Sequence, residues 1–206
     1  MKTVAILSQK GGTGKTTIAT NLCVAAEREG HTTALIDLDP QASATRWGDY
    51  REAKTPAIIA TPVSRLTHYL QIAEENGATL VILDTAPNSG PDALDIARAA
   101  SIVLIPCKPS MVDLDAIENT VKIAKIAEVP ARVVLNCVDA RSDLGNQARQ
   151  VIRQYDVECA PCQLGQRVGF VHAFNHGTGV QEFEPRAKSS DEITALYAYL
   201  SKEMGG

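Results

Sequence analysis

Short apolar runs alternate with segments of helical periodicity along the first two thirds of the chain. The apolar runs are rich in β-branched residues, and each is followed by polar, glycine or proline residues, which is typical of buried parallel strands. The predicted strands are residues 3–7, 33–36, 80–83, 102–105 and 132–138.

The segments between these strands predict helices. Residues 16–29 place apolar side chains on one face and stop before Gly30, as a helix with a glycine beyond its end does. Residues 113–128 repeat the pattern and stop before Pro130. Weaker helical patterns cover residues 63–75, 91–100, 145–155 and 192–204. The alternation predicts βαβ units, and therefore an α/β fold with a mostly parallel, twisted sheet flanked by helices on both faces.

Composition agrees with a layered α/β protein. Hydrophobic residues make up 45% of the 206 residues and aromatic residues only 4%, so the core must consist mainly of aliphatic side chains. Since no linker divides the chain, we expect residues 1–206 to form a single domain. The least regular stretch, residues 163–190, predicts loops near the carboxyl ends of the strands, where ligands bind in such folds.

The most informative motif directly follows the first predicted strand. Residues 8–17 read Ser-Gln-Lys-Gly-Gly-Thr-Gly-Lys-Thr-Thr, a phosphate-binding loop that leads into a helix. Glycines let the backbone N–H groups approach the phosphates, and the helix N-terminus adds a positive dipole. In such loops Lys15 reaches the β- and γ-phosphates, and the Thr16 hydroxyl binds Mg²⁺. The predicted ATP-binding residues here are Lys10, Gly11, Gly12, Thr13, Gly14, Lys15, Thr16 and Thr17.

This loop departs from the common pattern. In the spacing G-x-x-x-x-G-K-[ST] the first glycine falls at position 9, where this chain has Gln9. A second lysine, Lys10, stands just before the glycines. This lysine is either incidental or it binds a phosphate of its own.

Three aspartates follow predicted strands and supply the other parts of a nucleotide hydrolase. Asp84 ends the strand of residues 80–83, where a carboxylate can hold Mg²⁺. Asp39 precedes Pro40 and is placed to orient the water that attacks the γ-phosphate. Asp37 is assigned to tethering the loop or to the magnesium site. Asn136, near the end of a later strand, is placed where its amide could recognise adenine.

Charge and cysteine content narrow the function classes. The net charge of −4 excludes a nucleic-acid-binding protein that is basic as a whole, so any contact with DNA must be confined to a local group of basic residues. The five cysteines are odd in number and lie mostly in apolar segments, which argues against a disulfide framework. No apolar stretch approaches the ~20 residues of a membrane span and no secretory leader precedes the first strand, so we expect a cytoplasmic protein.

Together, the motifs at 10–17, 37–41 (Asp-Leu-Asp-Pro-Gln) and Asp84 resemble those of the ParA-type partition ATPases, whose P-loop is the deviant form with an extra lysine. The resemblance implies that Lys10 crosses a dimer interface to the nucleotide of the partner subunit. It also implies Mg²⁺-dependent ATP binding and ATP-dependent homodimerisation. Slow hydrolysis would be stimulated by a cargo adaptor that is ParB-like or ParG-like. The cargo could be a plasmid, a chromosome or a protein cluster such as chemoreceptors or carboxysomes.

Because the loop begins within ten residues of Met1, the chain resembles the short, ParF-like subgroup, which has no N-terminal DNA-binding region. In that subgroup the ATPase domain itself binds non-specific DNA, which implies association with the nucleoid. The candidate DNA contacts are Arg149, Arg153, Arg167, Arg186 and Lys188.

Three other functions stay open. A MinD-type positioning ATPase would end in a basic amphipathic membrane helix, but residues 193–204 contain one lysine, Lys202, and a stripe of apolar residues typical of a core-facing helix. An Mrp-type iron–sulfur carrier would use a C-x-x-C motif, which Cys159 and Cys162 form. A small-molecule ligase or kinase such as dethiobiotin synthetase shares the fold class and a related loop.

Overall fold

The strands of the described residues join one parallel sheet. In the computed structural model, which describes residues 1–87 and 90–205, the strand order is β3-β2-β4-β1-β5-β6-β7 and every neighbouring pair is parallel. The strands are β1 Lys2–Ile6, β2 Thr33–Asp37, β3 Ala57–Ala60, β4 Leu80–Asp84, β5 Ile102–Cys107, β6 Ala131–Val138 and β7 Glu158–Gly165. The predicted fold class is confirmed, and so are the five predicted strands.

The two strands that the sequence did not predict are the edge strands β3 and β7. β3 has four residues, none of them buried. β7 contains Pro161, which lacks a backbone N–H, and its register with β6 is interrupted by shifts. Proline is tolerated in an edge strand, where only one side of the strand is paired. Both strands therefore lack the long apolar run of a central strand.

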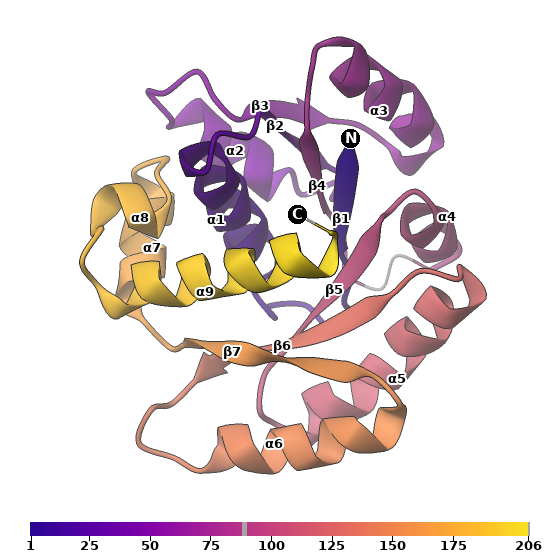
Figure 1. Cartoon of the computed structure of the whole chain (residues 1–206), viewed down its shortest axis with the longest axis vertical. Coiled ribbons are helices and arrows are strands. Elements are labelled where there is room, and N and C mark those ends of the chain that lie inside the picture. The colour runs from indigo at the N-terminus through magenta and orange to yellow at the C-terminus, as the bar shows by residue number, and fades with distance from the viewer. Residues whose placement is uncertain (88–89, 206) are drawn as a thin grey trace.

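Helices cover both faces of the sheet (Figure 1). One layer consists of α1 Lys15–Arg28, α2 Ser43–Asp49, α7 Val168–Asn175, α8 Val180–Phe183 and α9 Lys188–Glu203. The other consists of α3 Leu66–Glu75, α4 Asp92–Arg98, α5 Met111–Ile126 and α6 Leu144–Ile152. Short 3₁₀ turns at Val63–Arg65 and Arg153–Tyr155 precede α3 and follow α6.

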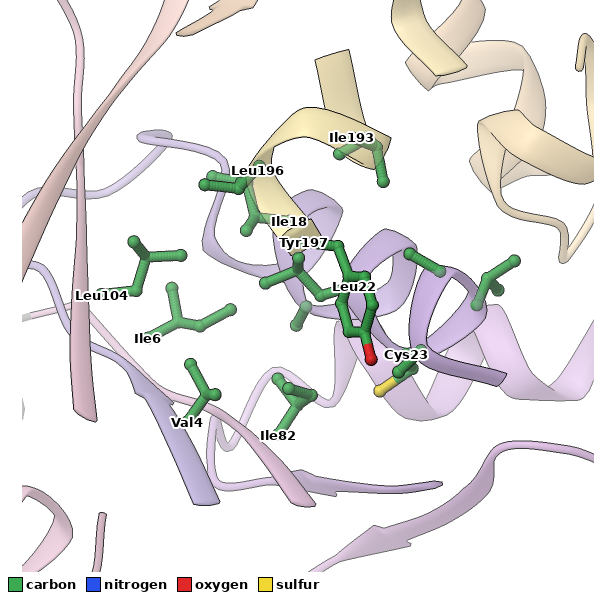
Figure 2. Close-up of a cluster of buried hydrophobic side chains, with 14 of the residues drawn as sticks. Val4, Ile6, Ile18, Leu22, Cys23, Ile82, Leu104, Ile193, Leu196 and Tyr197 are labelled. Atoms are coloured by element: carbon green, nitrogen blue, oxygen red, sulfur yellow. The ribbon is translucent and has the colours of Figure 1, made fainter. Parts of the chain in front are cut away.

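Each central strand divides its side chains between two cores. Ile6 and Ile82 face the layer of α1 and α9, whereas Ala5 and Val81 face the layer of α3 to α6, as the two-residue period of a strand requires. Figure 2 shows the first core, in which Ile18 and Leu22 of α1 meet Leu196 of α9 above the sheet. The apolar stripe of residues 193–204 is thus a core-facing helix stripe, as predicted.

The prediction for residues 163–190 was wrong in part. This stretch holds the end of β7, two short helices, α7 and α8, and the start of α9, in place of continuous loops. α2 was missed for a similar reason, since seven residues are too few to show a helical period. Among the helices of the described residues, none has both the length and the apolar composition needed to cross a bilayer.

The topology directs ligands to the carboxyl end of β1. From β1 the chain builds β2, β3 and β4 on one side of the sheet and then β5, β6 and β7 on the other. The point where the strand order reverses leaves a crevice at the carboxyl ends of the strands, and ligands bind there in open α/β sheets. The glycine-rich loop, residues 8–14, leaves β1 at this point.

Candidate nucleotide-binding site

The glycine-rich loop is shaped by two left-handed glycines. Gly12 has φ +71° and Gly14 has φ +90°, a region that side chains with a Cβ rarely adopt. Gly14 is the N-cap of α1, and its carbonyl accepts the first helical hydrogen bond from the Ile18 N–H, at 2.9 Å. No side chain caps this helix, so its free N–H groups face the loop and suit an anion.

Asn136 holds the loop in place. Its Nδ2 donates to the Thr13 carbonyl at 2.7 Å, and its Oδ1 accepts from the Cys137 N–H at 2.8 Å. A Cβ on Gly14 would lie only 2.2 Å from Asn136 Nδ2, so the glycine at this position makes room for the amide. Asn136 is 6% exposed. The hydrogen bonds show a clamp between β6 and the loop, and the predicted contact with adenine stays a prediction.

The two loop lysines differ in environment. Lys15 is 6% exposed, and its Nζ donates to the Lys10 carbonyl at 3.3 Å across the loop. Burial lowers the pKa of Lys15, while the Asp84 and Asp39 carboxylates oppose that shift. The Lys10 side chain is half-buried and makes no hydrogen bond or ion pair within residues 1–87 and 90–205. The ammonium of Lys15 is thus held within the loop, whereas the ammonium of Lys10 has no partner among the described residues.

Asp84 is the most unusual group of the site. It ends β4 and pairs in register with Ile6 of β1 on one side and Asp37 of β2 on the other. The residue is fully buried, and neither carboxylate oxygen has a hydrogen-bond partner among the described residues. Burial, helped by the nearby charge of Asp37, raises the pKa of Asp84 to about 7, against the opposing effect of Thr16 and Lys15.

An isolated buried carboxylate is costly unless a cation or proton compensates it. Both oxygens of Asp84 lack a hydrogen-bond partner among the described residues, and the Thr16 hydroxyl lies close to them. Oxygen ligands are those that Mg²⁺ prefers. The donor set therefore fits the predicted magnesium ion, with Thr16 and Asp84 as the residues that would hold it.

Asp37, by contrast, is fully engaged in structure. Its Oδ2 accepts from the backbone N–H and the hydroxyl of Thr45, at 2.9 and 3.0 Å, and its Oδ1 accepts from the Asp39 N–H at 3.2 Å. These bonds fasten α2 and the following loop to the end of β2. Of its two predicted roles, tethering agrees with this geometry, and the role in the magnesium site stays a prediction.

Asp39 lies at the rim of the site. Its Oδ1 accepts from the Gln41 N–H at 2.9 Å, and its side chain is half-buried. It lines a cleft of about 420 Å³ beside the glycine-rich loop. The structure therefore brings Asp39 together with Lys15, Thr16 and Thr17 along one cleft.

The other wall of this cleft is formed by α7, a helix that the sequence pattern did not predict. Phe170, Val171, Phe174 and Asn175 face the loop residues across the cleft. Their helix lies in the stretch expected to be irregular, so only the predicted position near the strand ends pointed to them.

The segment Asp37 to Tyr50 is tied to the chain beyond α7. Trp47 donates from Nε1 to the Thr178 carbonyl at 3.2 Å, and Arg51 forms an ion pair of 2.8 Å with Glu182. Gly177 has φ +63°, and a Cβ there would lie 2.4 Å from the backbone of Tyr50. The His-Gly-Thr-Gly sequence at 176–179 thus forms the close contact between α2 and the α7–α8 connection.

One further basic residue was missed. The Lys108 ammonium, on the loop after β5, lies 3.9 Å from where a Cβ on Gly12 would be. A lysine shortly after a predicted strand was the available signal, because the carboxyl ends of parallel strands meet at one edge of the sheet.

The five candidate DNA contacts are not equally available. Arg149 donates to the carbonyls of Ala160 and Cys162, at 2.5 and 3.1 Å, and so supports β7. Arg167 forms an ion pair with Glu192. The exposed candidates are Arg153, Arg186 and Lys188.

Cys159 and Cys162 do not form a paired site. They lie three residues apart on β7, and Cys162 packs against the α1–α9 core while Cys159 packs against the α3–α6 core. Burial raises the pKa of both thiols. Within the described residues, no group of three or more cysteine, histidine or carboxylate side chains is placed to hold a metal ion.

The chain is similar to a family of nucleotide-binding domains and to several known proteins. The family model "CbiA: CobQ/CobB/MinD/ParA nucleotide binding domain" matches residues 4–180. The maintenance of carboxysome distribution protein A of Gloeobacter kilaueensis is 31% identical, over 98% of this chain and 94% of its own. The sporulation initiation inhibitor protein Soj of Bacillus subtilis is 23% identical, over 98% of both chains. The septum site-determining protein MinD of Pyrococcus horikoshii, solved with Mg-ADP, has the same fold, with a TM-score of 0.83 at 16% identity, over 99% of this chain and 97% of its own.

Proposed function

Since the chain belongs to the CobQ/CobB/MinD/ParA nucleotide-binding family, we propose that it is a ParA-type ATPase that works as a nucleotide-switched dimer and positions a cargo. The observation that carries this proposal is the pair of unmatched charges at the loop. Asp84 is a buried carboxylate without a hydrogen-bond partner, and Lys10 is a lysine without an ionic partner among the described residues. A magnesium ion and a second nucleotide would satisfy them.

Apart from the Lys10 of the partner, the hydrolytic step uses residues of one protomer. Lys15 holds the β- and γ-phosphates of ATP, and the loop N–H groups bind the same anion. Magnesium, when held by Thr16 and Asp84, offsets the negative charge of the phosphates. One carboxylate oxygen of Asp39 accepts a hydrogen bond from the Gln41 N–H, and the other accepts none from the described residues. This second oxygen orients the attacking water. The products are ADP and inorganic phosphate.

The proposed dimer uses Lys10. Its side chain is half-buried on the same loop, while the Lys15 ammonium donates to the Lys10 carbonyl and is assigned to the protomer's own phosphates. In the proposed dimer, Lys10 of each protomer contacts the nucleotide of the partner, so that two ATP molecules lie at the interface. ATP therefore closes the dimer, and hydrolysis releases it.

The closed dimer binds DNA without sequence preference. Arg153, Arg186 and Lys188 are the candidate contacts that remain exposed, and a dimer doubles their number. Each phosphate that they neutralise releases counterions, so binding weakens as salt rises. The relatives named above are a maintenance of carboxysome distribution protein and a sporulation initiation inhibitor protein. We infer a cargo that is positioned in the cell and is coupled through an adaptor protein that stimulates hydrolysis.

The test is DNA binding by the full chain with Mg-ATP, with Mg-ADP and without nucleotide, each across a salt series. The proposal expects binding with ATP that is lost with ADP and weakens steeply with salt. Equal affinity in all three nucleotide states would refute the switch. ATP turnover that responds to a small metabolite, but to neither DNA nor a protein partner, would favour a ligase or kinase instead.

The iron–sulfur alternative has a separate test. Because Cys159 and Cys162 pack against different cores, we expect purified protein to be colourless and free of iron. A brown protein with about one iron atom per subunit or more would favour a carrier with a cluster shared between protomers.

A further inference from the structure

The loop after β5 places a third lysine beside the phosphate loop. β5 lies next to β1, and the first residue after β1, Leu7, donates from its N–H to the Leu104 carbonyl of β5 at 3.0 Å. The segments that follow β1 and β5 leave the sheet side by side. The Lys108 ammonium lies 3.9 Å from the position that a Cβ on Gly12 would occupy.

The backbone around Lys108 is well anchored. Its carbonyl accepts from the Ser110 N–H at 2.8 Å and from the Cys107 thiol at 3.2 Å. Ser110 then caps α5, with its side chain accepting from the Asp113 N–H. A lysine on such a fixed turn loses less conformational freedom on binding than one on a mobile loop.

Lys108 has no ion-pair partner among the described residues. No ion pair joins it to a carboxylate of residues 1–87 or 90–205, whereas Lys122 and Lys125 on the following helix are paired with Glu118 and Asp156. The acidic groups of the site, Asp37, Asp39 and Asp84, all come from the β2 and β4 side of β1. Lys108 and Asn136 come from the β5 and β6 side.

This division separates two tasks. The acidic side fits a cation, and the opposite side offers an ammonium and loop N–H groups to an anion. In a single protomer, before a partner supplies Lys10, magnesium and Lys15 would not neutralise the whole charge of a triphosphate.

We propose that Lys108 is a second lysine for the phosphates of the protomer's own nucleotide. It acts in cis beside Gly12, and so differs in role from Lys10, which serves the partner's nucleotide. This proposal rests on the proposed function, because it assumes that the loop binds a nucleotide.

The test is calorimetric titration of Mg-ADP into the wild type and three variants, at a protein concentration where light scattering shows monomers. Lys108→Gln removes the charge and Lys108→Arg keeps it. Lys202→Gln is the matched control, since this exposed lysine stands on the last turn of α9, near the amino end of β6. The expected result is a Kd about tenfold or more weaker for Lys108→Gln, the usual effect of losing a charge-assisted hydrogen bond. Lys108→Arg and Lys202→Gln should bind like the wild type.

Several results would overturn the proposal. Wild-type ADP affinity in Lys108→Gln would exclude the cis contact. A defect seen only as loss of ATP-dependent dimers would assign Lys108 to the partner's nucleotide. If Lys108→Gln fails to fold, Lys108→Met, which keeps the apolar stem, is titrated instead with the same expectation. Absence of nucleotide binding by the wild type is a different outcome, since it refutes the proposed function itself.

Discussion

Replacing Asp84 by asparagine should stabilise the protein in the absence of nucleotide and abolish magnesium-dependent hydrolysis. Asp84 is fully buried, and neither oxygen has a hydrogen-bond partner among the described residues. Its charge therefore opposes folding until a cation arrives. Asparagine keeps the shape of the side chain and removes the charge.

The magnitude follows from the pKa. Burial raises the pKa of Asp84 from 3.8 to about 7, which corresponds to at most about 4 kcal/mol of free energy of unfolding lost at pH 8. The asparagine amide is still a buried polar group without a partner, which costs about 1–3 kcal/mol. The net gain for Asp84→Asn at pH 8 is then about 1–3 kcal/mol.

The gain must depend on pH with a defined sign. Because the folded pKa lies above the unfolded one, the folded wild type holds an extra proton between about pH 4 and pH 7. The free energy of unfolding of the wild type is therefore undiminished by this carboxylate below pH 4 and decreases as the pH rises from 4 to 7. Asp84→Asn lacks this decrease. The advantage of the variant therefore grows from pH 4 to pH 7 and is constant above.

The assay is urea unfolding with EDTA at several pH values from 5 to 8. Asp37→Asn is the matched control, because the same change on the neighbouring strand removes a carboxylate that accepts three hydrogen bonds. It should destabilise the protein by about 1–3 kcal/mol. An Asp84→Asn protein that is no more stable than the wild type at pH 8, or whose advantage is independent of pH, would refute the reasoning.

Three further variants separate the roles of the loop residues. Asp39→Ala should bind ATP and dimerise but not hydrolyse it, measured as phosphate release beside nucleotide titration; loss of nucleotide binding would make the assigned role wrong. Lys10→Ala should bind nucleotide as a monomer and fail to dimerise with ATP in light scattering, and normal ATP-driven dimers would contradict the contact in trans. Asn136→Ala should lose about 1–3 kcal/mol of free energy of unfolding, because the buried Thr13 carbonyl loses its donor; it should also bind ADP more weakly, whereas unchanged unfolding and ADP titration would show that the clamp is dispensable.

The central part of the fold was predictable from the sequence, because its signals are local. β1, β2, β4, β5 and β6 are apolar runs, and α1 and α5 show a helical period over three turns or more. Edge strands need fewer apolar residues, so β3 and β7 carry no such run. α2, α7 and α8 have four to eight residues and owe their place to contacts such as that of Trp47 with Thr178.

The site divides in the same way. The loop glycines, Lys15 and Asp84 stand at the ends of strongly patterned strands, so the sequence placed them at one edge of the sheet. Asn136 and Lys108 reach the loop from β6 and from the end of β5, through contacts more than 90 residues apart in the chain. The sequence pattern does not contain these distances, and neither the clamp nor the third lysine was predicted.

The central claim, that Lys10 serves the nucleotide of the partner, is tested most directly by mixing Lys10→Ala with Lys15→Ala and measuring ATP hydrolysis. Each variant alone should be inactive, since one lacks the lysine in trans and the other the lysine in cis. In a mixed dimer, the site on the Lys10→Ala protomer has its own Lys15 and receives Lys10 from the partner. The account predicts that the mixture recovers activity that neither variant has alone. A mixture as inactive as its components, although mixed dimers form, would contradict it.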